Sequence, residues 1–436
     1  MHFVGVHLCD TRVSVLGLGY IGLPTAIIAA NSGFQVFGFD INISRIKKIR
    51  LGDISCIEEN LRTDFIAAIK SKKLIVDEAL KCADYFIICV PTPLRDGKAD
   101  LSAVWSAADS VSSVIKAGNV VVLESTVPVG TSQLFAQRII GNTGLQPGVD
   151  FFVAHCPERV LPGKIRQELV ENHRVIGGLT KQCADRACDF YKTFVSGLLH
   201  KTDLETAEMT KLIENSCRDV QIAFANQVAD MCDDAGVNAA RVIELANEHP
   251  RVSVLNPGPG VGGHCVAVDP QFLINSFPQS SALLQVSRVL NDSRPRKISK
   301  HAVSICKNIA EEKNKAANVL VLGLTYKPDV DDIRESPALS IAQSLNQHEN
   351  ICLKVCDPNV EKKAIEKLGF SIASDWENML GWADVVMLLV PHKAFSLVSK
   401  RMLDGKIIVD PTGFLEKKEQ SAISNREQGR EAGICF

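Results

Sequence analysis

The sequence predicts an α/β fold in which two parallel-sheet domains are joined by a long-helix central domain. Short apolar strands alternate with glycine turns and helices in the first part of the chain, and the same order of elements returns from about residue 315. Between these repeats, the apolar residues follow a helical period. We therefore expect three domains, at residues 1–200, 201–305 and 306–436, in a chain long enough for several hydrophobic cores.

The first repeat opens with a dinucleotide-binding pattern. The strand TRVSVLGLG leads into a turn that holds Gly17, Gly19 and Gly22, a helix follows, and the next strand, FQVFGFD, ends at Asp40. Glycines in such a turn let the backbone approach a pyrophosphate, and the acid accepts hydrogen bonds from a ribose 2′-hydroxyl while it repels a 2′-phosphate. The pattern predicts a Rossmann-like domain that binds NAD rather than NADP. The alternative for Asp40 is a capping residue after a strand.

Three further strands of the first domain end in polar side chains. ADYFIICVPTP carries Thr92 at its carboxyl end, VVLESTVPVGT carries Thr126, and FFVAHCPERVLPG carries Glu158 and Arg159. Because ligands of open parallel sheets bind at the carboxyl ends of the strands, we expect these four residues near the cofactor. The alternative is that the hydroxyls cap the following turns and the charges face solvent.

Residues 202 to 248 show helical periodicity, and we expect one long central helix there. Lys211 and Asn215 are four residues apart and therefore share a face, with Arg218 three residues further on. Such a row is either a solvated flank or part of a site. A long helix between two domains also offers a second face, which favours a homodimer through this helix. The apolar positions that we expect to share one stripe are Leu212, Cys217, Val220, Phe224 and Val228.

The stretch RVSVLNPGPGVGGHCVAVD, at residues 251–269, is the strongest candidate for a catalytic turn. Its glycines and prolines, among them Gly262, cannot continue a helix or a central strand, so the backbone must turn around Cys265. Asp269 follows four residues later. One interpretation is a tight surface loop with an inert cysteine. The other is a nucleophilic thiol, with a substrate lying against the glycine backbone.

The last third of the chain parallels the first third element by element. VSVLGLGYIGLP corresponds to VLVLGLTYKPDV, FQVFGFD to LKVCD, and KCADYFIICVPTP to GWADVVMLLVPHK. In the second copy, Tyr326, Lys327 and Arg334 stand where glycines and small residues would be. Lysine and arginine side chains suit a phosphate or diphosphate better than a second dinucleotide. The alternative is that these charges face solvent on a structural repeat.

Composition argues against several other classes of protein. Lys and Arg number 48 against 50 Asp and Glu, so no strong field of one sign favours nucleic acid or a charged membrane surface. The first residues lack the features of a signal peptide, and no segment offers 18 uncharged apolar residues. The 14 cysteines are scattered and include no CxxC pair. We expect a cytoplasmic protein without a membrane segment, a disulfide framework or a metal site.

Four stretches together resemble the UDP-glucose/GDP-mannose dehydrogenase family. They are CPERVLPG, TAEMTKLIENSCRDV, HPRVSVLNPGPGVGGHCVAVDP and GLTYKPDVDDIRESPA, and the resemblance covers nearly the whole chain. It implies a four-electron oxidation of the C6 alcohol of a nucleotide sugar to a carboxylate, with two molecules of NAD+ used in turn. The substrate that it implies is UDP-N-acetyl-D-mannosamine, a UDP-amino-sugar whose uronic acid serves surface polysaccharides.

The resemblance also implies roles for individual residues. Cys265 captures the aldehyde as a thiohemiacetal, which is oxidised to a thioester and then hydrolysed. Lys211 and Asn215 hold the developing oxyanion and the water, while Asp269 acts as a base or an orienting group. Glu158 lies near the hydrolytic water, and Thr126 matches the threonine of a catalytic STxPVG motif. Contacts with NAD are implied for Gly17, Gly19, Tyr20, Ile21, Gly22, Asp40, Thr92 and Thr126. Contacts with the nucleotide sugar are implied for Arg159, Val160, Lys211, Asn215, Arg218, His249, Arg251, Gly262, Tyr326, Lys327 and Arg334.

Several alternatives stay open. UDP-glucose dehydrogenases often carry a second glutamate where this chain has Pro162, which disfavours UDP-glucose; it remains an alternative substrate together with UDP-N-acetylglucosamine. A two-electron β-hydroxyacid dehydrogenase would share the Rossmann unit and a lysine–asparagine pair, but it needs neither the cysteine turn nor a third domain. A non-catalytic nucleotide-sugar-binding protein would not need the intact glycine and cysteine motifs. His249 and Arg251 are either structural or, by the resemblance, reach across a dimer interface.

Overall fold

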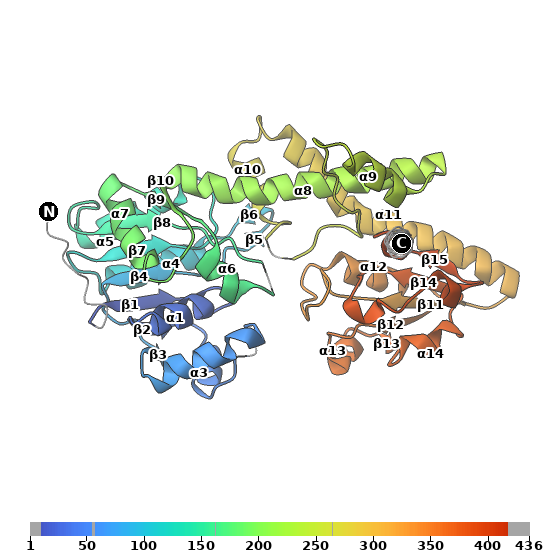
Figure 1. Ribbon diagram of the computed structural model, residues 1–436, viewed down its shortest axis with the longest axis horizontal. Coiled ribbons are helices and arrows are strands. Elements are labelled where there is room, and N and C mark those ends of the chain that lie inside the picture. Colours follow the sequence, from blue (N-terminus) through green and yellow to red (C-terminus); the bar gives the residue numbers. More distant parts are fainter. Residues whose placement is uncertain (1–9, 55–56, 162, 264, 417–436) are drawn as a thin grey trace, which may run out of the picture. The chain divides into compact units, whose positions relative to one another are not determined.

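The computed structural model describes residues 10–54, 57–161, 163–263 and 265–416 (Figure 1). The chain divides into two compact units. The first comprises residues 1–214 and 271–278, and the second comprises residues 215–270 and 279–436. Pro162, at which the sequence departs from UDP-glucose dehydrogenases, lies outside the described residues.

An eight-stranded sheet forms the centre of the first unit, in the order β10-β9-β8-β7-β4-β1-β2-β3. Neighbouring strands are parallel except β8 and β9, which are antiparallel. The strands are β1 (Arg12–Leu16), β2 (Gln35–Phe39), β3 (Leu74–Asp77), β4 (Tyr85–Ile88), β7 (Val120–Leu123), β8 (Phe152–His155), β9 (Arg174–Gly178) and β10 (Leu199–Asp203). A small hairpin joins β5 (Leu94–Arg95) to β6 (Lys98–Ala99).

Helices cover both faces of this sheet (Figure 1). Side chains of a strand point alternately to opposite faces, so Tyr85 and Ile87 of β4 join one core cluster, whereas Phe86 and Ile88 join the other. Strands buried on both faces must be apolar throughout, as β4 and β7 are. The helices are α1 (Gly22–Asn31), α2 (Ile43–Arg50), α3 (Arg62–Lys70), α4 (Ser102–Ser112), α5 (Thr131–Thr143), α6 (Ile165–Glu171) and α7 (Lys181–Tyr191).

A five-stranded parallel sheet forms the core of the second unit, in the order β13-β12-β11-β14-β15. Its strands are β11 (Ala317–Leu322), β12 (Ile351–Cys356), β13 (Ser371–Ile372), β14 (Val385–Leu388) and β15 (Ile407–Val409). Its shorter helices are α9 (Ala239–Asn247), α12 (Pro337–Leu345), α13 (Lys362–Lys367) and α14 (Trp376–Leu380), and 3-10 turns lie at Lys393–Phe395 and Lys400–Leu403.

The two sheets repeat one topology. In the first sheet the strands β3-β2-β1-β4-β7 are neighbours, and in the second the order is β13-β12-β11-β14-β15. In both cases the first strand of the repeat is flanked by the second and the fourth, which is the arrangement of doubly wound nucleotide-binding sheets. The predicted fold class, two Rossmann-like sheets with a long-helix region between them in sequence, is confirmed.

Two long helices lie between the two sheets in sequence, α8 (Leu204–Ala235) and α11 (Ala282–Lys313), with the short α10 (Asp269–Ser276) between them. The predicted apolar stripe of α8 is partly wrong, because Cys217 is exposed and the side chain of Phe224 is 54% exposed. The buried face instead includes small and polar residues, such as Asp219, Ala223 and Asn226. Within the residues that the structure describes, no helix is both long enough and apolar enough to cross a membrane.

The inward polar residues of α8 are buried because α11 supplies their partners. Arg288 donates to Asp219 over 2.6 Å, and Asn291 donates to the same carboxylate over 2.8 Å. Asn226 donates to Asn291 over 3.2 Å. Buried polar groups are tolerated when they are hydrogen-bonded, so a polar seam between two helices can replace an apolar one.

Candidate active site

The glycine turn after β1 has the form that a dinucleotide requires. A Cβ at Gly17 would lie 2.6 Å from the Cys89 carbonyl oxygen, and a Cβ at Gly22 would lie 1.8 Å from the carbonyl oxygen of Gly17. These two positions therefore exclude side chains for packing reasons. A Cβ at Gly19 would meet nothing within 4 Å, so at this position the backbone borders open space. This is the place at which a pyrophosphate approaches such a turn.

Asp40 lies at the end of β2 beside this turn and is buried. Its carboxylate accepts hydrogen bonds from the backbone N–H groups of Leu18 and Asn42, each over 2.8 Å. It also pairs with Arg45 over 2.9 Å, a partner that the sequence analysis did not identify. Because the carboxylate is fixed beside the glycine turn, these residues fit the ribose end of a dinucleotide.

The other predicted cofactor residues have local partners. The Tyr20 hydroxyl donates to Glu58 over 3.2 Å, and Ile21 lies directly before α1. The Thr92 hydroxyl donates to the carbonyl oxygen of Thr126 over 2.7 Å, which joins the ends of β4 and β7. The structure therefore brings Thr92 and Thr126 together, with the Thr92 hydroxyl engaged in a contact between loops.

Glu158 belongs to a buried ion pair. Its carboxylate accepts from Arg174 over 2.6 Å and from the backbone N–H of Arg159 over 2.7 Å. Arg174, at the start of β9, is only 2% exposed. The sequence analysis missed Arg174, although an arginine at the start of the apolar strand RVIGG is a signal that could have found it.

A second buried carboxyl group, that of Glu124 at the end of β7, lies in the same unit. It accepts from the hydroxyl of Tyr191 over 2.6 Å and from the thiol of Cys89 over 3.1 Å. Burial raises the pKa of Glu124, although the charge of Arg174 acts in the opposite direction. Burial also raises the pKa of the Cys89 thiol well above its usual value, so this cysteine is a thiol and not a nucleophilic thiolate.

Arg159 pairs with Glu214 of α8, with its Nε 3.0 Å from a carboxylate oxygen, and it also donates to the carbonyl oxygen of His173 over 3.3 Å. Val160 packs against the core of the first unit. Lys211 lies on α8 and is half-buried. The first unit thus contains Glu158, Arg159 and Lys211, whose roles were predicted from the sequence.

The second unit contains the thiol turn. Cys265 is exposed, and its carbonyl oxygen accepts from the N–H groups of Val268 and Asp269, each over 2.9 Å, as the chain enters α10. Asp269 is the first residue of α10 and is 3% exposed. The Asn215 amide donates to its carboxylate. The structure therefore brings Cys265, Asp269 and Asn215 together, as the sequence analysis expected of a site.

The glycines before Cys265 make room for another part of the chain. A Cβ at Gly263 would lie 2.9 Å from the Tyr326 ring, and a Cβ at Gly262 would lie 2.6 Å from the Glu335 carbonyl oxygen. Both contacts come from residues 324–335, which we call the lysine loop. The lysine loop thus occupies the side-chain positions of these two glycines, which gives a packing reason for glycine at both.

The lysine loop carries the cationic residues predicted for the second repeat. Arg334 pairs with Asp332 over 2.6 Å, and the Lys327 ammonium lies 5.9 Å from the centre of the Tyr326 ring. Burial raises the pKa of Tyr326 to about 12, with smaller contributions in the same direction from the nearby Asp332 and Cys265, so its side chain is a neutral phenol. These contacts place the predicted phosphate-binding residues and the thiol turn in one unit.

Three predicted residues of the second unit are exposed and have no described contact with the thiol turn. Arg218 lies on the exposed side of α8. His249 and Arg251 follow α9, where the Arg251 N–H donates to the His249 ring over 3.3 Å. In the part of the chain that the structure describes, no group of three or more His, Cys, Asp or Glu residues could hold a metal ion.

A glycine turn for a dinucleotide, a second sheet of the same topology with a cationic loop, and an exposed thiol define an NAD-dependent oxidoreductase. The chain matches the UDP-glucose/GDP-mannose dehydrogenase family in its NAD binding domain (residues 11–195), central domain (residues 205–293) and UDP binding domain (residues 320–417). The protein belongs to this family, and its cofactor is NAD.

Relatives of known name align over most of the chain. The chain is 41% identical over 412 residues to the UDP-N-acetyl-D-mannosamine dehydrogenase of Yersinia pestis, covering 92% of this chain and 98% of that protein. It is 42% identical over 418 residues to the NDP-N-acetyl-D-galactosaminuronic acid dehydrogenase of Ralstonia nicotianae, covering 94% and 97%. The solved UDP-D-ManNAc dehydrogenase of Pyrococcus horikoshii is similar in structure, with a TM-score of 0.83, 38% identity and coverage of 92% and 96%.

Proposed function

We propose that this protein oxidises C6 of UDP-N-acetyl-D-mannosamine to a carboxylate in a four-electron reaction through Cys265. The observation that carries the proposal is the group of contacts around the thiol. Asp269 and Asn215 are hydrogen-bonded beside it, and Tyr326 of the lysine loop packs against Gly263 just before it. The 41% identity to a UDP-N-acetyl-D-mannosamine dehydrogenase supports the choice of sugar.

The reaction consumes the alcohol, two NAD+ and one water, and it yields the carboxylate, two NADH and three protons. NAD supplies the hydride acceptor when it is bound. Lys211 stabilises the alkoxide as C6 loses its first hydride, and the thiolate of Cys265 then adds to the aldehyde carbon. Lys211 and Asn215 stabilise the oxygen of this thiohemiacetal, and one good donor in such a position is worth about 2.7–4 kcal/mol.

After the second hydride has left, Cys265 is held as a thioester. Water attacks its carbonyl carbon, the carbon–sulfur bond breaks, and the thiolate is restored. We assign to Glu158 the role of accepting the proton of this water, while Asp269 orients Asn215 through their hydrogen bond. Thr126 follows β7, and its carbonyl oxygen accepts a hydrogen bond from Thr92. It completes this set of catalytic residues.

The remaining residues bind the nucleotide sugar. Lys327 and Arg334 bind its diphosphate through charge-assisted hydrogen bonds, and Tyr326 holds the lysine loop against the thiol turn. We assign the other contacts with the substrate to Arg159, Val160, Arg218, His249, Arg251 and Gly262. NAD is bound by Gly17, Gly19, Tyr20, Ile21, Gly22, Asp40, Thr92 and Thr126.

The decisive experiment counts NADH. The wild-type protein should form two NADH per UDP-N-acetyl-D-mannosamine consumed, and Cys265→Ser should form the uronic acid on the order of a thousandfold more slowly or worse, because a serine hydroxyl is far less nucleophilic than a thiolate. Cys352→Ser, which alters another exposed thiol, serves as the control. A Cys265→Ser protein that makes uronic acid at nearly the wild-type rate would refute covalent catalysis, and one NADH per sugar would favour a two-electron dehydrogenase.

A second candidate substrate is an N-acetylgalactosamine nucleotide, because the Ralstonia nicotianae relative is 42% identical and is named for the corresponding uronic acid. A panel of the UDP derivatives of N-acetylmannosamine, N-acetylgalactosamine, N-acetylglucosamine and glucose separates the sugars by kcat/KM. We expect N-acetylmannosamine to give the highest value. If another sugar exceeds it tenfold or more, the proposed substrate is wrong while the reaction class stands.

We also propose that the protein is a homodimer assembled through α8. An exposed row of apolar side chains follows this helix at spacings of four and seven residues, which are the spacings of a helix–helix contact. The row consists of Ile213, Cys217, Phe224 and Met231, and we call it the α8 apolar row.

The matched family ranges support domains near residues 1–200, 201–305 and 306–436. A role in polysaccharide biosynthesis and a cytoplasmic location follow from the nature of the proposed substrate and of NAD.

A further inference from the structure

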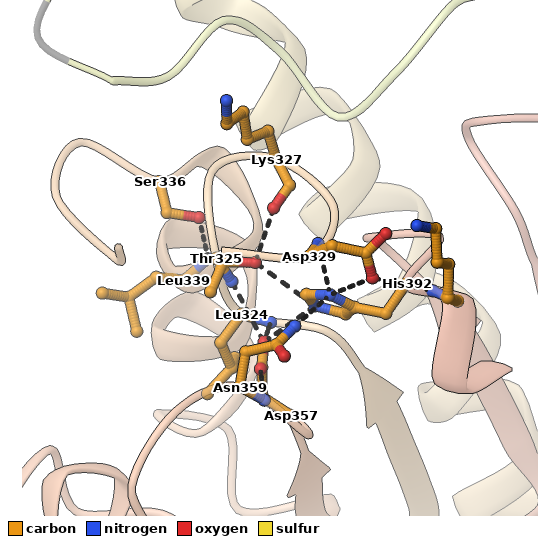
Figure 2. Close-up of polar contacts among 10 residues, drawn as sticks. Leu324, Thr325, Lys327, Asp329, Ser336, Leu339, Asp357, Asn359 and His392 are labelled. Atoms are coloured by element: carbon orange, nitrogen blue, oxygen red, sulfur yellow. Dashed lines mark hydrogen bonds and ion pairs between the residues drawn. The ribbon is translucent and has the colours of Figure 1, made fainter. Parts of the chain in front are cut away.

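A buried imidazole, that of His392, lies at the centre of a hydrogen-bond cluster in the second unit (Figure 2). His392 follows β14, and its side chain is 0% exposed. Its Nδ1 is 3.0 Å from the backbone nitrogen of Asp329 and 2.8 Å from the amide nitrogen of Asn359. Its Nε2 is 3.1 Å from Asp357 and 3.2 Å from the hydroxyl of Thr325. The proposed mechanism does not use this residue.

These contacts fix the tautomer of the ring. A backbone N–H can only donate, so Nδ1 must accept from Asp329 and therefore carries no hydrogen. The hydrogen is on Nε2, where it is shared between Asp357 and the hydroxyl of Thr325. That hydroxyl in turn donates to the backbone carbonyl of Lys327 over 2.9 Å. One imidazole thus holds the lysine loop at Thr325 and at Asp329.

The cluster occupies the place that belongs to the ribose in the first repeat. Asp40 and Asp357 end corresponding strands, and each accepts from the residue after a glycine at the start of the turn, Leu18 over 2.8 Å and Leu324 over 2.7 Å. The side-chain partner of Asp40 is Arg45, which is 40% exposed, whereas the partner of Asp357 is the wholly buried His392. In the second repeat, the carboxylate of Asp357, which corresponds to Asp40, therefore anchors the lysine loop through His392.

The lysine loop needs such an anchor because its backbone is strained. Asp329 and Glu335 have φ values of 59° and 51°, in the left-handed region that side chains other than glycine rarely adopt. Asp329 is held on both sides, because its N–H donates to His392 and its carboxylate accepts from the N–H of Lys393 over 2.9 Å. In Figure 2 the Lys327 side chain points away from the cluster while its carbonyl oxygen takes part in it.

We propose that His392 is a positioning residue for the nucleotide end of the substrate. Through Nδ1 it fixes the conformation of the lysine loop in which Lys327 and Arg334 receive the diphosphate. This inference rests on the proposed function, which assigns diphosphate binding to these two residues. It predicts that losing the Nδ1 contact weakens binding of UDP and raises KM for the UDP-sugar, while KM for NAD is unchanged.

Two substitutions separate the two sides of the ring in the full-length protein. In His392→Asn an amide oxygen can replace Nδ1 as the acceptor for Asp329, whereas in His392→Gln an amide nitrogen can replace Nε2 as the donor to Asp357 and the acceptor is lost. We expect His392→Gln to bind UDP about tenfold more weakly in calorimetry, and His392→Asn to stay within about threefold of the wild-type protein. KM for the UDP-sugar should change in parallel with these affinities.

Asn359→Asp tests the same contact without altering the buried ring. Asn359 is exposed, and a carboxylate at this position faces the Nδ1 lone pair with an acceptor in place of a donor. We expect Asn359→Asp to weaken UDP binding, as His392→Gln does. The proposal can therefore still be tested if the His392→Gln protein does not fold. Asp375→Ala removes the N-cap of α14 in the same unit and controls for a loss of stability alone.

The proposal is supported only if His392→Gln or Asn359→Asp loses UDP affinity while His392→Asn and Asp375→Ala retain it. It is overturned if all variants bind UDP like the wild-type protein, if Asp375→Ala loses affinity equally, or if KM for NAD rises as much as KM for the UDP-sugar. A wild-type protein that does not bind UDP would refute the proposed function itself and this inference with it. That outcome is distinct, because it is seen before any substitution is made.

Discussion

Arg174 and Glu158 form a buried ion pair, since Arg174 is 2% and Glu158 is 8% exposed. Removing one partner of such a pair leaves a buried charge without compensation, which costs about 3–5 kcal/mol. We expect Arg174→Met to lower the free energy of unfolding by this amount, measured by urea denaturation.

The double variant Arg174→Met with Glu158→Gln provides the control for this prediction. It removes both charges, so it should recover much of the stability that Arg174→Met loses. If the single and the double variant are equally unstable, lost packing around Arg174 and not the unpaired carboxylate accounts for the effect.

His155, at the end of β8, is wholly buried, and its ring nitrogens have no hydrogen-bond partner among the described residues. Burial lowers the pKa of His155 to about 3. Below the unfolded pKa of about 6.5, the unfolded chain therefore takes up a proton that the folded chain does not. The protein should lose about 1.4 kcal/mol of stability per pH unit as the pH falls from about 6.5 towards 3.

The variant His155→Gln cannot titrate, so its unfolding free energy should fall less between pH 7 and pH 5.5 than that of the wild-type protein. His348→Gln, at an exposed position of the second unit, should keep the wild-type dependence on pH. An unchanged slope in His155→Gln would mean that other groups cause the loss of stability in acid.

Among the elements, those that depend on local sequence could be predicted, and those that depend on distant partners could not. The strand ending at Asp40 and the glycine turn at Gly17 were found because a buried strand and a turn with positive φ leave local signals. The predicted apolar stripe of α8 was partly wrong because the buried Asp219 has its partners on α11, Arg288 and Asn291, which are 69 and 72 residues away in the chain.

The candidate site shows the same limit. The glycine-rich turn marked Cys265 as a candidate, the resemblance to the family implied roles for Asp269 and Asn215, and the structure brings the three together. No spacing indicated that His392 would hold the lysine loop, because its contacts with Thr325 and Asp329 join residues 67 and 63 positions apart. A histidine inside the stretch VPHK is equally consistent with a simple core residue.

The α8 apolar row is the part of this helix that a second copy of the chain would cover. If it does, a carboxylate that replaces a member of the row, such as Met231 at its end, has to be buried without a partner in both copies. We expect Met231→Glu to raise the Kd of the dimer on the order of a hundredfold, measured by sedimentation equilibrium. Met402→Glu places the same change at another exposed methionine of the second unit and should leave the dimer intact. A wild-type protein that sediments as a monomer, or equal effects of both variants, would contradict assembly through α8.

At the scale of the whole molecule, one sheet topology serves two ligands. Both repeats place a carboxylate beside the turn after their first strand, and in the first repeat the backbone of this turn borders open space at Gly19. In the second repeat, His392 is hydrogen-bonded to the corresponding carboxylate, that of Asp357. The lysine loop carries cationic side chains in place of glycines. The two sheets should therefore bind different ligands, a dinucleotide at the first and a UDP group at the second.

This difference can be tested on the unaltered protein, because a ligand that binds only the folded state stabilises the structure to which it binds. At a concentration one hundred times its Kd, each ligand contributes about 2.7 kcal/mol. We expect NAD to slow amide exchange in peptides around residues 17–22, and UDP to slow it around residues 324–335, measured by mass spectrometry. Helix α14, which neither ligand is expected to touch, is the internal reference. If UDP protects the first glycine turn as strongly as NAD does, the assignment of one ligand to each sheet is wrong.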